Sequence, residues 1–237
     1  MRLEENRVRL SIDANKRIKE KRYWLNQLSG DLVKSFFPYD RKKTDPGKQN
    51  FETVTFEIAG DTFKRVMQLG NNSDLRLHII FTAVLVGILY KYTGNRDIII
   101  GAPIKKQQIK GEFLNTVLIL RNRLSPAQSF KELLLNASRV TAEAHEHVNY
   151  PMNTLLYQLN IPYSERDFPL FDVALLLKNI HNKENIGHLN LNMIFSFFRK
   201  EESIAGEVEF NWSNYCQSTI RRIVSYSRRR LFVTVCP

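Results

Sequence analysis

Residues 74–92 constrain the fold more than any other segment, because the centre of this stretch is apolar around nearly the whole circumference of a helix. Such a helix is stable only where other elements cover most of its surface. Its uncharged run, residues 77–90, is shorter than the roughly 20 residues that a membrane-spanning helix needs. We therefore expect a buried helix at the centre of a layered domain, and no contact with a membrane.

The flanking segments alternate between strand and helix patterns. Residues 53–58 alternate strictly between polar and apolar and predict a strand with one buried face, whereas the mostly apolar residues 97–103 predict a buried strand. Ser129 and Glu132 form a capping box at the head of a long helix that runs towards His147. Further helices are predicted at 15–28, 61–69, 153–159 and 216–226, and further strands at 113–122, 170–177, 189–197 and 208–212. This interleaving predicts an α/β fold, with a mixed β-sheet packed against helices.

Two segments also carry a prediction about their position. Residues 113–122 are mostly apolar on both faces, which is typical of a central strand. Residues 36–50 contain Pro38, the turn sequence Asp45-Pro46-Gly47 and several charges, so we expect an exposed loop there. Pro151 is expected to end the long helix that precedes it.

The formal net charge of +11 is high, but the Lys and Arg residues are spread along the chain, and the densest cluster lies at 221–222 and 228–230. Nucleic-acid-binding domains usually gather such charge on one face or one helix, so we expect no nucleic-acid partner. The two cysteines, Cys216 and Cys236, match no metal-binding or redox spacing. They cannot supply a disulfide framework for the chain, and a reducing cytoplasm is therefore the expected location.

No catalytic or phosphate-binding motif is present in the sequence, and no metal site is expected. Among the five histidines, His145 and His147 form the one close pair, but residues two apart on a helix point to different faces. We expect one of them on the solvent face and the other packed at the helix end. His78 lies within the apolar helix and is expected to be a core histidine with its hydrogen bonds satisfied.

Several motifs resemble the second half of the condensation domains of nonribosomal peptide synthetases. Residues 111–116, Gly-Glu-Phe-Leu-Asn-Thr, are similar to the family's glycine-x-phenylalanine-valine-asparagine-threonine motif, and residues 120–121 match its leucine-arginine. Residues 147–151 are similar to the histidine-glutamine-x-x-proline motif, with Val148 in place of the glutamine. Further matches lie at 23–30, 38–41, 89–98, 101–103 and 169–173, and all the motifs occur in the same order as in the family.

The resemblance implies a chloramphenicol-acetyltransferase-like lobe, the C-terminal one of two, which forms one wall of a tunnel. In that tunnel the family joins an amine to an acyl or aminoacyl thioester, each delivered on the phosphopantetheine arm of a peptidyl carrier protein. The family's catalytic signature, two adjacent histidines followed by aspartate-glycine, belongs to the N-terminal lobe. This sequence has no adjacent histidines and no Asp-Gly pair. We therefore expect no catalytic residue in the chain and no condensation by the chain alone.

The resemblance also implies four residues that border the tunnel: Asn115, Thr116, Arg121 and His147. Asn115 and Thr116 would lie on the strand beside it, where an amide side chain can both donate to and accept from a pantetheine arm. Asn115 could instead satisfy its neighbours at a bend of the strand. Arg121 either pairs with a carboxylate of the missing lobe or is an exposed arginine at a strand end.

The expected organisation is a lead-in segment at 1–15, the lobe at 16–226 and an atypical basic tail at 227–237. After residues 219–224 the family would continue an amphipathic helix with buried leucines, whereas this chain continues with charged and β-branched residues. Three hypotheses remain open: half of a condensation enzyme, active with an N-terminal lobe; a carrier-docking module without catalysis; and the remnant of a disrupted synthetase gene. The sequence does not identify the amino acid or acyl group.

Overall fold

The computed structural model describes residues 17–41, 50–106, 115–162 and 168–235, without the side chains of 229–235. The strands are β1 (Phe51–Ala59), β2 (Asp97–Pro103), β3 (Val117–Arg123), β4 (Val173–Leu177), β5 (Met193–Arg199) and β6 (Ser203–Asn211). The helices are α2 (Ile18–Gln27), α3 (Gly60–Leu69), α4 (Asp74–Thr93), α5 (Phe130–Glu146), α6 (Met152–Gln158), the 3₁₀ helix η1 (Lys183–Ile186) and α7 (Gln217–Val235).

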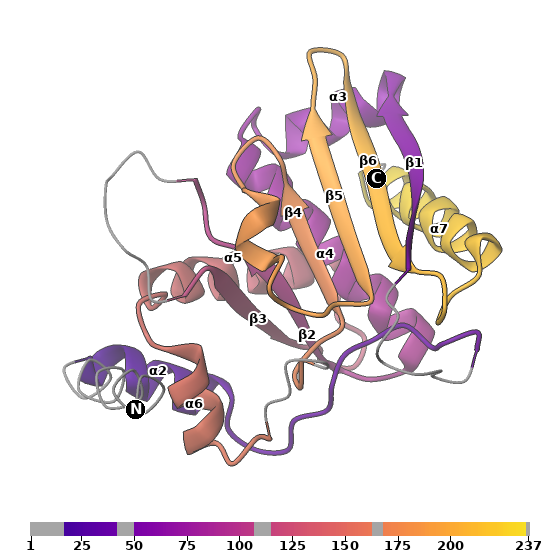
Figure 1. The fold of residues 1–237 in the computed structure, drawn as a ribbon. Helices are drawn as coiled ribbons and strands as arrows, with labels where there is room; N and C mark the ends of the chain where they lie inside the picture. The colour runs from indigo at the N-terminus through magenta and orange to yellow at the C-terminus, as the bar shows by residue number, and fades with distance from the viewer. Residues whose placement is uncertain (1–16, 42–49, 107–114, 163–167, 236–237) are drawn as a thin grey trace.

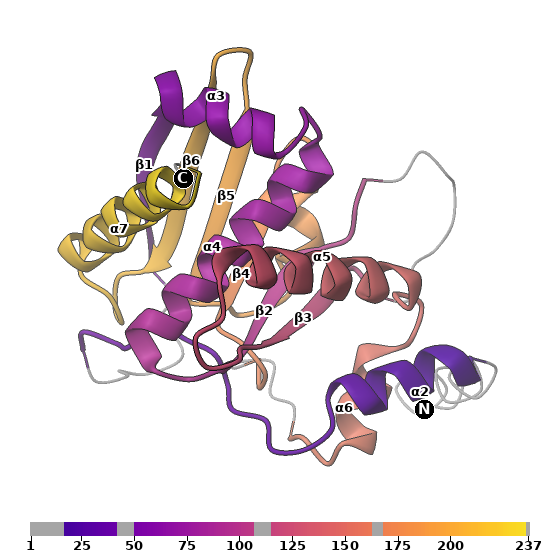
Figure 2. The same ribbon diagram turned by 180° about the vertical axis from the view of Figure 1, so that it is seen from behind.

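The strands form one mixed sheet of six strands in the order β1-β6-β5-β4-β2-β3. Strand β4 runs parallel to both of its neighbours, β2 and β5, and the other pairs are antiparallel. Helices α3, α4, α5 and α7 lie behind the sheet in Figure 1 and in front of it in Figure 2, so they share one face. Helices α2 and α6 lie side by side below β3 in both views. The predicted mixed sheet packed against helices is confirmed.

Helix α4 is the buried centre that its apolar sequence predicts. The Ser73 side chain caps its first turn by accepting from the Arg76 backbone N–H, and Gly94 ends it in the left-handed conformation with φ of 69°. Glycine adopts this conformation without a steric penalty. By length and composition α4 could also cross a membrane, but 61% of its most apolar window is buried inside the protein. Helix α5 begins with the predicted capping box of Ser129 and Glu132.

Strand β3 is at the edge of the described sheet, so the prediction of a central strand at 113–122 was wrong. The strand begins at Val117, and residues 113–114 lie outside the described part of the chain. It is nevertheless buried up to Asn122. Helix α5 packs against it, and Arg121 on the opposite face reaches the carbonyl end of α2. A strand that is covered on both faces has an apolar sequence even at an edge.

The prediction of an exposed loop at 36–50 holds for Pro38, Asp40 and Arg41 but was wrong for Phe37. The Phe37 side chain is fully buried. The Asp40 carboxylate accepts from the Cys216 backbone N–H at 2.7 Å and from the Thr219 hydroxyl at 2.9 Å, and so caps the start of α7. The Arg41 guanidinium donates to the Trp212 carbonyl oxygen at 2.9 Å. Residues 42–49 lie outside the described part.

Helix α7 runs across the expected boundary at 226–227 and continues to Val235. The described backbone therefore does not change its structure where the basic tail was expected to begin. The lead-in segment at 1–15 and Cys236 lie outside the described residues. Cys216 is a free, partly exposed thiol.

Candidate functional site

The four residues implied by the motifs lie around one region, which we call the β3 junction. It consists of β3 and the two residues just before it, Asn115 and Thr116, together with the C-terminal half of α2 and the turn from His147 to Met152 between α5 and α6. Arg121 projects from β3 towards the end of α2. Figure 1 shows these elements together below the sheet.

Arg121 is 3% exposed, so the prediction of an exposed arginine at a strand end was wrong. Its guanidinium group holds the Asp97 carboxylate at 2.5 to 2.8 Å through two nitrogens. The other N–H groups donate to three backbone carbonyls at and just after the C-terminal end of α2, those of Gln27, Ser29 and Asp31. Arg121 thus fixes α2 to the edge of the sheet, and the carboxylate that it pairs with belongs to this chain.

Asn115 precedes β3 rather than lying within it, and it is 8% exposed. Its Nδ2 group donates to the Val148 carbonyl oxygen at 3.1 Å and to the Tyr150 carbonyl oxygen. Its Oδ1 atom accepts from the Met152 backbone N–H at 2.9 Å, at the start of α6. Because both donors are in use, what remains for a ligand is acceptor capacity on Oδ1. This geometry favours the structural alternative for its amide nitrogen.

Thr116 follows Asn115 and is half-buried. Its hydroxyl group donates to the Asn185 carbonyl oxygen of η1 at 2.6 Å, and its own carbonyl accepts from the Ile104 N–H at 3.0 Å. The hydroxyl oxygen keeps acceptor capacity. Thr116 therefore joins the junction to the segment that follows β2 and to η1.

His147 ends α5, as expected for one member of the histidine pair. Its Nδ1 atom lies 2.9 Å from the Glu143 carbonyl oxygen, which can only accept, so Nδ1 carries the proton. A neutral ring then presents Nε2 as an acceptor. The ring stacks on Tyr23 of α2 with 4.2 Å between the centroids, and the His147 carbonyl accepts from Trp24 Nε1 at 2.7 Å. Burial, followed by the charge of Glu143, raises the pKa of Tyr23, which therefore stays neutral.

The junction holds its groups rigidly but lacks a nucleophile–base pair within the described residues. The groups that it can offer to a ligand are three hydrogen-bond acceptors: Oδ1 of Asn115, the Thr116 hydroxyl oxygen and Nε2 of His147. Acceptors of this kind suit the N–H groups of an amide or an amine. Among the described residues, three or more His, Cys, Asp or Glu side chains do not gather in a way that could hold a metal ion.

A buried polar network at the ends of β4, β5 and β6 was not anticipated from the sequence. Asp172 is fully buried; it accepts from the Tyr39 hydroxyl group and from Asn192 Nδ2, and it forms an ion pair of 2.8 Å with Lys34. Oδ1 of Asn192 accepts in turn from two further asparagines, Asn211 and Asn214. The available signal was that these polar residues interrupt or end otherwise apolar strands.

The predictions for two other histidines were right only in part. His78 is fully buried, as expected of a core histidine, but neither ring nitrogen forms a hydrogen bond of good geometry among the described residues, and the nearby Leu175 backbone is its one weak polar contact there. His145, the member of the pair expected on the solvent face, is half-buried. Its Nε2 atom is buried and has no hydrogen-bond partner among the described residues. Neither of the two side chains belongs to the β3 junction.

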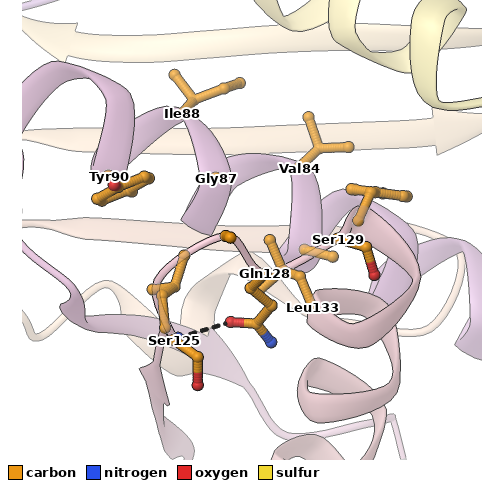
Figure 3. A pocket seen from close by; sticks show the side chains of 12 residues that line it. Val84, Gly87, Ile88, Tyr90, Ser125, Gln128, Ser129 and Leu133 are labelled. Carbon is orange, nitrogen blue, oxygen red and sulfur yellow. Dashed lines mark hydrogen bonds between the residues drawn. The ribbon is translucent and has the colours of Figure 1, made fainter.

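A cavity of about 270 Å³ lies between α4 and the start of α5 (Figure 3). Its walls are largely apolar, with Val84, Gly87 and Leu133 among them, and at its rim the Gln128 side chain accepts from the Ser125 N–H at 3.0 Å. None of the four residues implied by the motifs lines it. The cavity is therefore separate from the β3 junction.

The model of the condensation domain family matches residues 10–231. Surfactin synthase subunit 2 of Bacillus subtilis is 34% identical over 190 residues, which are 76% of this chain and 5% of that protein. Gramicidin S synthase 2 of Aneurinibacillus migulanus is 29% identical over 236 residues, 88% of this chain and 5% of that protein. This chain thus spans a small part of the curated relatives that it matches.

Solved structures agree on the fold. A variant of the starter condensation domain of rhizomide synthetase, in complex with C8-CoA and Leu-SNAC, superposes with a TM-score of 0.74 at 20% identity and covers 94% of this chain and 53% of that chain. The X-domain from teicoplanin biosynthesis, in complex with OxyB, gives a TM-score of 0.72 at 17% identity, over 91% of this chain and 51% of that chain. The expected chloramphenicol-acetyltransferase-like fold is confirmed. Its sequence and its fold together place this chain in the condensation-domain family of nonribosomal peptide synthetases.

Proposed function

We propose that this chain is the C-terminal lobe of a condensation domain and forms amide bonds only together with an N-terminal lobe. The supporting observation is that nearly the whole chain superposes on only 53% of a solved condensation domain. The missing part would carry the adjacent histidines, which this sequence lacks. The reaction proposed for the complete domain joins an amine to an acyl or aminoacyl thioester.

The β3 junction is the part of this chain that we assign to the tunnel wall. Asn115 and Thr116 would accept hydrogen bonds from the amides of a phosphopantetheine arm, through the oxygens that keep spare lone pairs. Nε2 of His147 would accept from the incoming amine or from the same arm. Arg121 would act indirectly. It holds α2 and β3 in place, and its own N–H groups are already in hydrogen bonds.

The proposed partners are peptidyl carrier proteins and an N-terminal lobe or neighbouring synthetase modules, in the cytoplasm. The net charge of +11 suits a carrier protein with an acidic surface. Two large apolar side chains of the helices beside the junction, Ile18 of α2 and Tyr157 of α6, are 64% and 82% exposed. Exposed side chains of this size would be covered by a second lobe.

The test is amide formation between two carrier proteins, one loaded with an acyl or aminoacyl thioester and the other with the amine substrate. The isolated chain should yield no more product than uncatalysed aminolysis. A mixture with a separately produced N-terminal lobe of a related condensation domain should restore turnover, and that lobe alone serves as the control. Turnover by the isolated chain would refute the proposal.

A carrier-docking module without catalysis is the second candidate, and the same high positive charge favours it. The two candidates differ in one measurement. A docking module binds a loaded carrier protein with measurable affinity but gives no turnover when the N-terminal lobe is added. Half of an enzyme gives turnover with that lobe.

A further inference from the structure

Helices α4 and α5 form a wedge on one face of the sheet. They approach each other at Gly87 and Leu133, where a Cβ atom on Gly87 would lie 3.6 Å from the Leu133 side chain. From there the N-terminal half of α4 and the C-terminal half of α5 diverge (Figure 2). His78 belongs to the first of these halves and His145 to the second.

A third histidine meets His78 from the sheet. His181 follows β4, and its ring lies 4.6 Å from the His78 ring, edge to face. We call His78, His145 and His181 the histidine cluster. His181 also forms a β-bridge with Lys105, which follows β2, so the cluster joins α4, α5 and the ends of two central strands.

The cluster is poorly satisfied by hydrogen bonds. Both ring nitrogens of His78 and the Nε2 atoms of His145 and His181 are buried and form no hydrogen bond of good geometry among the described residues, whereas Nδ1 of His181 accepts from the Leu177 backbone N–H at 3.0 Å. One helical turn from His78 and His145, towards the point where the helices meet, the hydroxyl groups of Thr82 on α4 and Thr141 on α5 are also buried without a hydrogen-bond partner among the described residues. Each buried group without a partner lowers stability, so this region is held together by its packing and not by its polar contacts.

The charges that act on the cluster are all positive. Burial lowers the pKa of His78 to about 3; His145 and Lys105 lower it as well, and the Leu175 backbone raises it in part. Burial and then Lys105 lower the pKa of His145 to about 4. Burial, the other two histidines, Lys105 and Lys106 lower the pKa of His181 to about 2. No carboxylate contributes to these shifts, so a proton taken up in the closed wedge meets no counter-charge.

We propose that the histidine cluster is an acid-sensitive switch, which opens the wedge between α4 and α5 when its imidazoles take up protons. Opening breaks the bridge between Lys105 and His181 and frees the backbone around residues 104–106 and 178–181. Thr116 bonds to Ile104 and to Asn185, so the same movement loosens the β3 junction. Among the described residues, groups of three or more His, Cys, Asp or Glu side chains that could hold a metal ion are absent, so a metal site is not the alternative we favour.

The direction of the pH dependence follows from the two states. In the open state each imidazole has an ordinary pKa near 6.5, and in the closed state it lies at about 4 or below. The closed wedge is therefore fully stable above pH 6.5 and loses stability as the pH falls towards 4. Between pH 7 and pH 5 the opening equilibrium should increase by about 20-fold for each histidine that the opening exposes.

Backbone hydrogen exchange of the whole chain at pH 7, 6 and 5, corrected for the intrinsic rate at each pH, measures this opening. Protection should fall by at least about 20-fold in residues 74–82, 104–106 and 178–181, while β1 and β6 keep theirs. In His145→Gln, the loss of protection between pH 7 and pH 5 should be about 20-fold smaller than in the unmodified chain, because one titrating imidazole is gone. His188→Gln, in an exposed position outside the cluster, is the matched control and should retain the full response.

Two results would overturn the proposal. One is loss of protection to the same extent in β1, β6 and the wedge, because that describes acid unfolding of the whole chain. The other is an unchanged response in His145→Gln. If that variant does not fold, the order in which the segments of the unmodified chain lose protection decides the question by itself.

Discussion

Replacing Arg121 by alanine should destabilise the chain strongly, because the side chain links β3 to Asp97 of β2 and to the C-terminal end of α2. It is 3% exposed, pairs with the Asp97 carboxylate and donates to three backbone carbonyls at and just after the C-terminal end of α2. Removing one partner of a fully buried ion pair typically costs about 3–5 kcal/mol. Asp97 is 28% exposed and can be hydrated, so we expect Arg121→Ala to cost about 2–4 kcal/mol, mainly because the backbone carbonyls lose their donor. That is a large share of the roughly 5–15 kcal/mol that stabilises a domain.

Arg123 provides the matched control on the same strand. It also reaches Asp97, at 3.8 Å, and the Ser29 carbonyl at 3.1 Å, but its side chain is 59% exposed. Exposed pairs contribute less than about 1 kcal/mol, so Arg123→Ala should cost no more than that. The comparison separates the effect of burial on stability from the effect of charge, because both variants lose one arginine near the same carboxylate and differ in how deeply that arginine is buried.

Urea unfolding followed by tryptophan fluorescence measures both variants. Trp24 is 2% exposed and lies within the junction, so its emission reports the separation of α2 from the rest of the protein. The midpoint should fall strongly for Arg121→Ala and little for Arg123→Ala. Equal losses, or a loss below about 1 kcal/mol for Arg121→Ala, would refute the view that buried hydrogen bonds of this arginine hold α2 on the sheet.

Four further predictions follow from other parts of the chain. Asn115→Ala should lower the stability of the chain by about 1–3 kcal/mol, because the turn between α5 and α6 loses its hydrogen bonds to this side chain; a larger loss in the activity of a reconstituted pair of lobes would support a role in the tunnel, and parallel losses a purely structural one. Asp40→Ala should cost about 0.5–2 kcal/mol in urea unfolding, because α7 loses its cap, and no loss would contradict that role. Gly101→Ala should destabilise the chain, since its Cβ would lie 2.3 Å from the Phe171 ring, and Phe171→Leu should partly restore stability in the double variant. Light scattering over a concentration series should show self-association of the isolated chain, and a strict monomer at high concentration would contradict an exposed lobe interface.

Local sequence signals predicted most of the elements but not their neighbours. The alternation at 53–58 and the capping box of Ser129 and Glu132 depend on nearby residues, and both are present as predicted. The edge position of β3 depends on strands far away in sequence, and an apolar strand does not reveal which elements cover it. Phe37 is buried for the same reason, because a loop with charges and prolines can still insert one aromatic ring into a core.

The residues of the candidate site were predicted from the family's motifs, and the chemical properties of the residues alone did not identify them. The four motif residues do lie around one region, but their contacts could not be read from the sequence. Arg121 has a carboxylate partner within the chain, and Asn115 uses its donors on the turn between α5 and α6. The histidine cluster was missed because its members come from three separate segments, and spacing along the chain says nothing about their distance in space.

The pairing of β1 with β6 has a consequence for synthesis on the ribosome. All nine residues of β1 pair with residues of β6 that lie about 150 positions later in the chain. At 5–20 residues per second, roughly 8 to 30 s pass between the emergence of the two strands. During this interval the backbone N–H and C=O groups of β1 have no partner strand, so the nascent chain exposes an unpaired strand edge until β6 has been made.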